Sequence, residues 1–123
     1  MNMKENCREQ LTLVKEATRN PEAAYVVRSR LKRLVLSCNR MIAQQYGLPE
    51  PVLPEDPFDV PKHASKETYD LAVCCARLIN STKALCQPSE ALDVRWKTEW
   101  GSVQNQLTRL DDLLERVSLS TRD

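Results

Sequence analysis

The chain has 123 residues, with 18 Lys or Arg against 17 Asp or Glu, so its formal net charge is +1 at neutral pH and it offers no global field for nucleic acid or anionic lipid. Its 41% hydrophobic and 28% charged residues are typical of one globular domain and exclude a disordered chain. Only two glycines are present, which argues against glycine-rich phosphate loops and against a sheet-rich fold with many hairpin turns.

Apolar residues recur at helical spacing in four stretches of the chain. The pattern predicts helices over residues 3–18, 21–46, 65–86 and 89–117, and therefore an all-α four-helix bundle. Asn20 and Pro21 suit the cap and first turn of the second helix, so the link between the first two helices is short and predicts an antiparallel hairpin. We expect residues 1–118 to form a single domain and residues 119–123 a frayed tail.

The second predicted helix is locally basic. Between Ala23 and Pro49 the chain carries five positive residues and no acidic residue. Arg30, Arg33 and Arg40 fall opposite its apolar stripe, whereas Arg28 and Lys32 flank the stripe. These arginines either form a solvated face, partly neutralised by the acidic segment that follows, or steer an acidic partner.

Residues 48–62 contain five of the seven prolines, four acidic residues and the only phenylalanine, Phe58. Prolines at this density exclude a helix and favour extended chain. Such a segment spans roughly 40 Å, about the length of a 26-residue helix. We therefore expect a crossover loop that returns along the bundle, so that the third helix runs parallel to the second. Its apolar residues predict that it packs on the bundle rather than forming a solvated linker.

The third predicted helix begins at Ser65, a suitable N-cap. Its outer face is unusual because it carries no charge, whereas a surface helix normally has a charged outer face. The residues of this face are Tyr69, Val73, Ala76, Asn80 and Ala84. The pattern predicts that something covers the face, either a partner or the proline-rich loop, and the two interpretations are equally supported.

The fourth predicted helix has apolar residues at alternating intervals of four and three, which is a heptad pattern. They are Trp96, Trp100, Val103, Leu107, Leu110, Leu114 and Val117. This pattern is typical of a coiled coil or of a four-helix bundle, and we favour the bundle. Trp96 and Trp100 either fill the end of the bundle or anchor a partner.

Residues that could carry chemistry are few. His63 is the only histidine, and no nucleotide-binding, metal-binding or catalytic motif occurs. The five cysteines lack paired metal-ligand spacing, and their odd number favours a reducing compartment. With no apolar signal or membrane-spanning stretch, we expect a non-enzymatic protein in the cytoplasm or nucleus, without cofactor or metal.

The sequence thus predicts a protein–protein interaction domain, an adaptor, scaffold or complex subunit, that docks a partner helix, an acidic peptide or a second copy of itself. The candidate contact residues are Tyr69, Val73, Ala76, Asn80, Ala84, Phe58, Trp96 and Trp100. Arg30, Arg33 and Arg40 are the candidates for electrostatic docking. Binding of nucleic acid or an anionic surface through the basic second helix is the alternative.

Overall fold

A computed structural model describes residues 3–19, 24–56, 58–84 and 91–117 of the chain, and for residues 24, 84 and 91–100 it describes only the backbone. The four helices are α1 (Met3–Ala17), α2 (Ala24–Tyr46), α3 (Lys66–Ala84) and α4 (Ala91–Arg116). No strand occurs among these residues, so the all-α prediction is confirmed. The predicted starts at residues 21 and 89, the predicted end at residue 86 and the tail 119–123 lie outside the described residues. No helix in the described part of the chain is long and apolar enough to cross a membrane.

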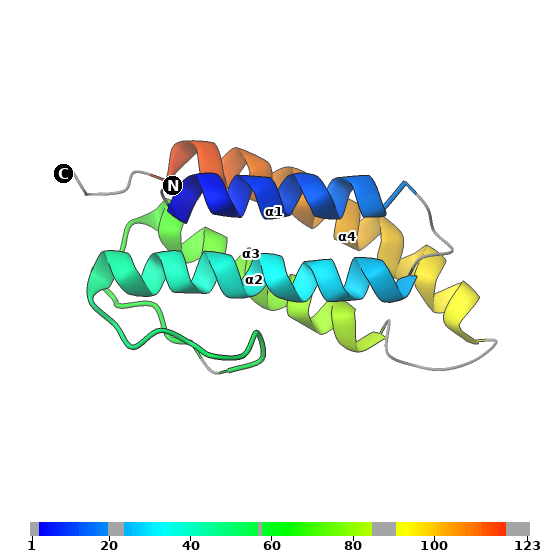
Figure 1. Ribbon diagram of the computed structural model, residues 1–123, viewed down its shortest axis with the longest axis horizontal. Helices are drawn as coiled ribbons and strands as arrows, with labels where there is room; N and C mark the ends of the chain where they lie inside the picture. Colours follow the sequence, from blue (N-terminus) through cyan, green and yellow to red (C-terminus); the bar gives the residue numbers. More distant parts are fainter. Residues whose placement is uncertain (1–2, 20–23, 57, 85–90, 118–123) are drawn as a thin grey trace.

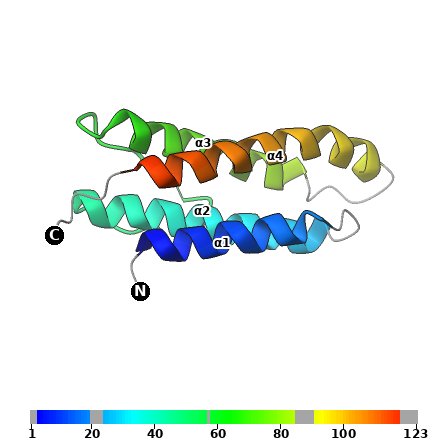
Figure 2. The ribbon, with the colours of Figure 1, turned by 90° about the horizontal axis from the view of Figure 1, so that it is seen from above.

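The helices form a four-helix bundle in which each helix runs antiparallel to the next (Figure 1). Viewed from above, α1 and α2 form one layer and α3 and α4 the other (Figure 2). Ion pairs join α4 to α1 and close the bundle. The Arg8 guanidinium lies 2.9 Å from the Glu115 carboxylate, and the Lys15 ammonium lies 2.8 Å from that of Asp111.

The prediction that the third helix runs parallel to the second is wrong. The Ser65 amide, immediately before α3, donates to the Tyr46 hydroxyl at the end of α2, at 3.4 Å. The start of α3 therefore lies beside the end of α2, and the two helices are antiparallel (Figure 1). The proline-rich loop is long enough to climb the bundle, but it reverses its direction midway and comes back.

A local hydrogen-bonding arrangement explains this reversal. The Asp56 carboxylate accepts hydrogen bonds from the backbone amides of Val52 and Leu53, at 3.0 and 2.8 Å, and the Asp56 amide donates to the Leu53 carbonyl at 3.1 Å. Such bonds from an aspartate side chain to nearby amides stabilise a turn. The loop consequently runs out along α2 and back, and its length does not produce a crossover.

Both junctions of the loop are capped, and the cap at Ser65 is the one that the sequence predicts. Gly47 has a φ of +66°, the left-handed conformation that glycine adopts without strain, and the amide of Leu48 donates to the Ala43 carbonyl at 2.8 Å. At the other junction, the Ser65 hydroxyl accepts the amide of Thr68 at 3.2 Å, as an N-cap does. These caps end α2 and start α3 at defined residues.

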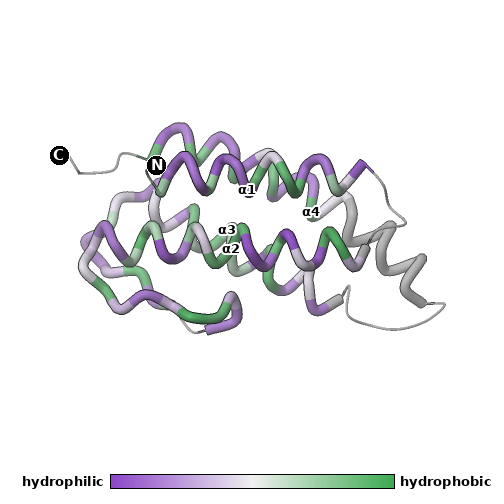
Figure 3. Tube along the Cα trace, in the orientation of Figure 1, coloured by the Kyte–Doolittle hydropathy of each residue, from purple (hydrophilic) through white to green (hydrophobic). Residues whose placement is uncertain are grey.

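The core is one apolar cluster to which all four helices contribute. Hydrophobic and hydrophilic positions alternate along each helix (Figure 3), as expected for helices with one buried face. The heptad positions of α4 whose side chains are described are all buried, and Leu113 is buried beside them. These heptad positions are Val103, Leu107, Leu110, Leu114 and Val117. The predicted apolar seam therefore faces the other helices of the bundle.

Candidate functional site

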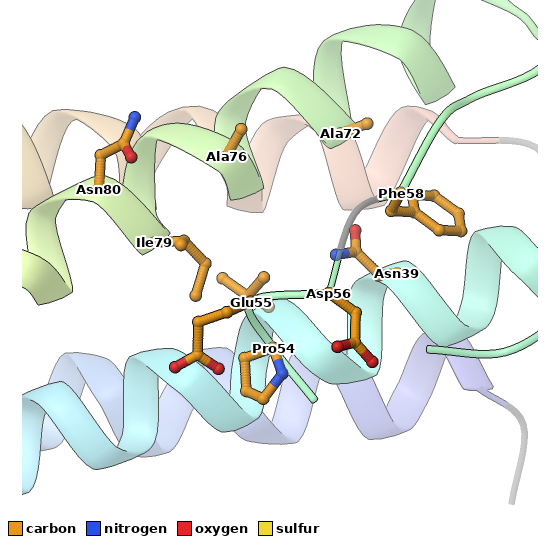
Figure 4. Close-up of a pocket in the computed structure, with 10 residues that line it drawn as sticks. Asn39, Pro54, Glu55, Asp56, Phe58, Ala72, Ala76, Ile79 and Asn80 are labelled. Carbon is orange, nitrogen blue, oxygen red and sulfur yellow. The ribbon is translucent and has the colours of Figure 1, made fainter. Parts of the chain in front are cut away.

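One hollow in the described part of the chain lies where the proline-rich loop meets α2 and α3. It is a cavity of about 200 Å³ with walls from three elements. The lining residues are Val35, Asn39, Pro54, Glu55, Asp56, Phe58, Ala72, Ala76, Ile79 and Asn80. Figure 4 shows Ala72, Ala76 and Asn80 along α3, with Pro54 and Glu55 of the loop near Ile79. The lining combines apolar side chains with the amides of Asn39 and Asn80 and the carboxylates of Glu55 and Asp56.

The loop is held over this cavity by the basic residues of α2. The Lys32 ammonium lies 2.8 Å from the Glu55 carboxylate. The Arg40 guanidinium donates from Nε to the Pro51 carbonyl at 3.0 Å. The hydrogen bond from Lys32 lowers the pKa of the Glu55 carboxyl, because it favours the ionised form. The loop therefore packs on the bundle, as its apolar content predicts, and Phe58 is partly buried against the core.

The loop lies beside the uncharged face of α3 without burying it. Ala76 and Asn80 line the cavity beneath it, together with Phe58. Tyr69 is 58% exposed, Ala76 and Asn80 are exposed as well, and Val73 is half-buried. The interpretation that the loop covers this face is therefore wrong for the described residues. The face is open, including its end at Tyr69, and coverage by a partner stays a prediction.

A second hollow, of about 490 Å³, adjoins this open end. Tyr69 forms one wall of the hollow, and the other lining residues come from the end of the loop and the start of α3. They are Val60, Pro61, Lys62, Ala64 and Lys66. The predicted face residues from Tyr69 to Asn80 therefore form a continuous strip between the two hollows, called the α3 strip below. None of these predicted residues is charged.

Three predicted contact residues can be placed only along the backbone. Trp96 and Trp100 lie in α4, and Ala84 is the last residue of α3. Their side chains fall outside the described part of the structure. Whether the tryptophans fill the bundle end or contact a partner stays a prediction.

The three arginines predicted for electrostatic docking have different surroundings. Arg40 binds the loop through the Pro51 carbonyl. Arg30 and Arg33 instead line a hollow of about 200 Å³ beside α1, with Tyr25 and Val26. Tyr25 and Val26 are not among the contact residues predicted from the sequence. Both lie outside the apolar stripe of α2. An apolar or aromatic residue outside that stripe is the sequence feature that could have identified them.

The four thiols in the described part of the chain are buried among apolar side chains. Cys7, Cys38, Cys74 and Cys75 are free and at most 1% exposed. Hydrogen bonds with Cys7 and Cys75, together with burial, raise the pKa of Cys38 well above its ordinary value. Burial raises the pKa of Cys74 to about 12. Protonated thiols in such surroundings are inert core side chains.

His63 lies at the surface, where its ring meets the Tyr46 ring edge-on with centroids 5.4 Å apart. It lies in the loop, whereas the four described cysteines lie in α1, α2 and α3 and are buried. Across the described ranges, no group of three or more His, Cys, Asp or Glu side chains is arranged to hold a metal ion.

Comparison with models of protein families, with curated proteins and with solved structures found no match to this chain.

Proposed function

We propose that the chain is a protein-interaction domain that docks an amphipathic partner helix along α3. One observation carries the proposal: the strip from Tyr69 to Asn80 has no charged member, yet Tyr69 is 58% exposed and Ala76 and Asn80 are exposed beside the cavity. An uncharged strip bordered by hollows is the form in which a groove receives the apolar face of a helix.

The proline-rich loop supports the proposal because it extends the strip. Phe58 lies in the wall of the cavity, so a partner on α3 would contact Ala76, Asn80 and the loop together. Apolar contact at the centre and polar groups at the edge is the usual composition of an interface. A domain of this kind would serve as an adaptor, a scaffold or a subunit of a complex.

Site-specific crosslinking tests the proposal. A photoreactive phenylalanine analogue at position 69 should crosslink to a discrete partner in cells, and Ala76→Glu should abolish the product. Because Ala76 is exposed, this variant should keep the helicity and melting temperature of the wild type. The same analogue at Thr108, an exposed residue of α4, is the control and should give no product.

Three other results would be informative. A product of twice the chain mass, with a molar mass in solution that rises with concentration, would identify the partner as a second copy. A product unaffected by Ala76→Glu, or none at all, would remove the α3 strip as the binding surface. Unfolding of Ala76→Glu would mean that the position belongs to the core.

A further inference from the structure

The flank of α2 that faces away from the proline-rich loop carries the hollow beside α1, which differs chemically from the cavity under the loop. It lies between α1 and the first half of α2 and is lined by Gln10, Tyr25, Val26, Ser29, Arg30 and Arg33. Tyr25 is 76% exposed and Val26 is 37% exposed, two of only five large hydrophobic residues exposed within the described residues. Two arginines thus stand beside a small exposed apolar surface.

Charge distinguishes this flank of α2 from the flank that meets the proline-rich loop. In α2, from Ala24 to Tyr46, there is no acidic residue. On the loop side, Lys32 pairs with Glu55 and Arg40 binds the Pro51 carbonyl. On the α1 side, no acidic residue lines the hollow, and Arg30 and Arg33 have no ion-pair partner among the residues that the structure describes. The acidic loop therefore neutralises only one flank of the helix.

The loop itself illustrates what a basic flank of α2 binds. It is rich in proline and acidic, and it contributes a carboxylate to Lys32, a carbonyl to Arg40 and an apolar side chain, Phe58, to the cavity. The hollow beside α1 offers the same combination of cations and apolar contact. We propose that this hollow binds an extended acidic segment of another protein, with carboxylates on Arg30 and Arg33 and an apolar side chain against Tyr25 and Val26.

The spacing of the arginines fits such a segment. Arg30 and Arg33 lie three residues apart, a rise of about 4.5 Å along one helix face. In an extended chain, alternate side chains project from the same side about 7 Å apart, a separation that two long arginine side chains can reach. Each guanidinium can take a carboxylate in two parallel hydrogen bonds. Because exposed ion pairs contribute little alone, the apolar contact with Tyr25 and Val26 is needed for affinity.

The same features disfavour nucleic acid as the ligand. Two arginines can neutralise few phosphates, and the net charge of +1 provides no wider field. Tyr25 is the only aromatic side chain that lines the hollow, so there is no series of rings on which successive bases could stack. An anionic membrane surface would similarly require a broader cluster of cations.

Selection from a displayed library of random 12-residue peptides tests the proposal. The bait is the whole chain, and the Arg30→Glu/Arg33→Glu double variant is the counter-selection. We expect enriched peptides that carry two or more Asp or Glu residues beside an aliphatic or aromatic residue. Fluorescence anisotropy of one such peptide should show at least a tenfold weaker Kd for the double variant and a weaker Kd for Tyr25→Ala.

The controls separate this site from the α3 strip. Arg77→Glu/Lys83→Glu reverses two exposed charges on α3 and should change the Kd by less than twofold. Ala76→Glu changes the α3 strip and should leave the Kd of the selected acidic peptide unchanged. The peptide measurement therefore tests the hollow beside α1 independently of the function proposed for the α3 strip. Circular dichroism establishes that each variant is folded before its Kd is interpreted.

Three outcomes would overturn the proposal. One is that no peptide is enriched at low salt, and another is that enriched peptides lack acidic residues or bind the double variant equally well. The third is that a labelled DNA duplex or phosphatidylserine vesicles bind through Arg30 and Arg33 when no acidic peptide does. That outcome would assign the hollow to phosphate-bearing ligands.

Discussion

Raising the pH above 9 should destabilise the protein because its core contains protonated thiols. Cys74 is 1% exposed and its pKa is raised to about 12 by burial. Its Sγ lies 3.2 Å from the Gln106 carbonyl, and the thiol can donate this hydrogen bond only while it keeps its proton. In the unfolded chain the thiol ionises at its ordinary pKa of about 8.5. The folded state therefore holds the proton more tightly than the unfolded state.

The sign and size follow from linkage. A pKa raised by folding contributes stability that is fully present below the unfolded pKa and is lost as the pH rises toward the folded pKa. Between pH 8.5 and 10.5, Cys74 should lower the free energy of unfolding by about 2 kcal/mol, because the unfolded thiol is half ionised at pH 8.5 and the loss then approaches about 1.4 kcal/mol per pH unit. The pKa of Cys38 is raised as well, so it should add a loss in the same direction. Total stabilities of about 5–15 kcal/mol are usual, so the loss is large.

Urea unfolding at a series of pH values from 7 to 10.5, under reducing conditions, measures this dependence. The slope against pH in wild type should be steeper than in Cys74→Ala by about 1.4 kcal/mol per unit above pH 9. Comparing slopes removes the constant loss caused by deleting a buried sulfur atom. Equal slopes in the two proteins would show that Cys74 titrates alike when folded and unfolded, and the reasoning from its burial would be refuted.

Three further outcomes are expected. Lys32→Met should raise the pKa of the Glu55 carboxyl toward its ordinary value, measured by NMR titration, because the hydrogen bond that favours the ionised form is lost; an unchanged pKa would contradict the contact. Leu34→Ala should lower the free energy of unfolding by about 2–5 kcal/mol, since Leu34 is fully buried. Tyr69→Ala should change it by less than about 0.5 kcal/mol, because Tyr69 is exposed. Similar losses for the two variants in urea unfolding would contradict the burial of Leu34 and the exposure of Tyr69. Iodoacetamide should alkylate Cys38 only under unfolding conditions, as read by peptide mass spectrometry, and rapid labelling of the native chain would show that the thiol is accessible.

The helices could be predicted from the sequence because their determinants are local. The heptad positions of α4 from Val103 to Val117 are all buried, and a period near 3.6 leaves little choice of inner face. Gly47 and Ser65 adopt the capping roles typical of their residue types. These features depend on neighbours within one or two turns, and such neighbours are visible in the sequence.

The direction of α3 could not be predicted in the same way, because the length of a loop limits its reach without determining its path. The decisive contacts are the Asp56 carboxylate with the amides of Val52 and Leu53, and the Glu55 carboxylate with Lys32, far earlier in the chain. The first is a turn that many aspartates near prolines could form, and the second depends on tertiary structure. The same limit applies to the uncharged face of α3, since the sequence predicts that it is covered without distinguishing the loop from a partner.

The basic character of α2 connects the loop with the proposed acidic-segment site. Like charges three or four residues apart on a helix destabilise it by roughly 0.2–0.5 kcal/mol per pair. Arg28 and Lys32 form one such pair, and Glu55 relieves it by binding Lys32 at 2.8 Å. Arg30 and Arg33 form another, and no described acidic residue relieves it. An acidic segment bound beside Tyr25 would therefore stabilise α2 by the same electrostatic means as the loop, so the selected peptide should raise the melting temperature of the wild type but not that of Arg30→Glu/Arg33→Glu.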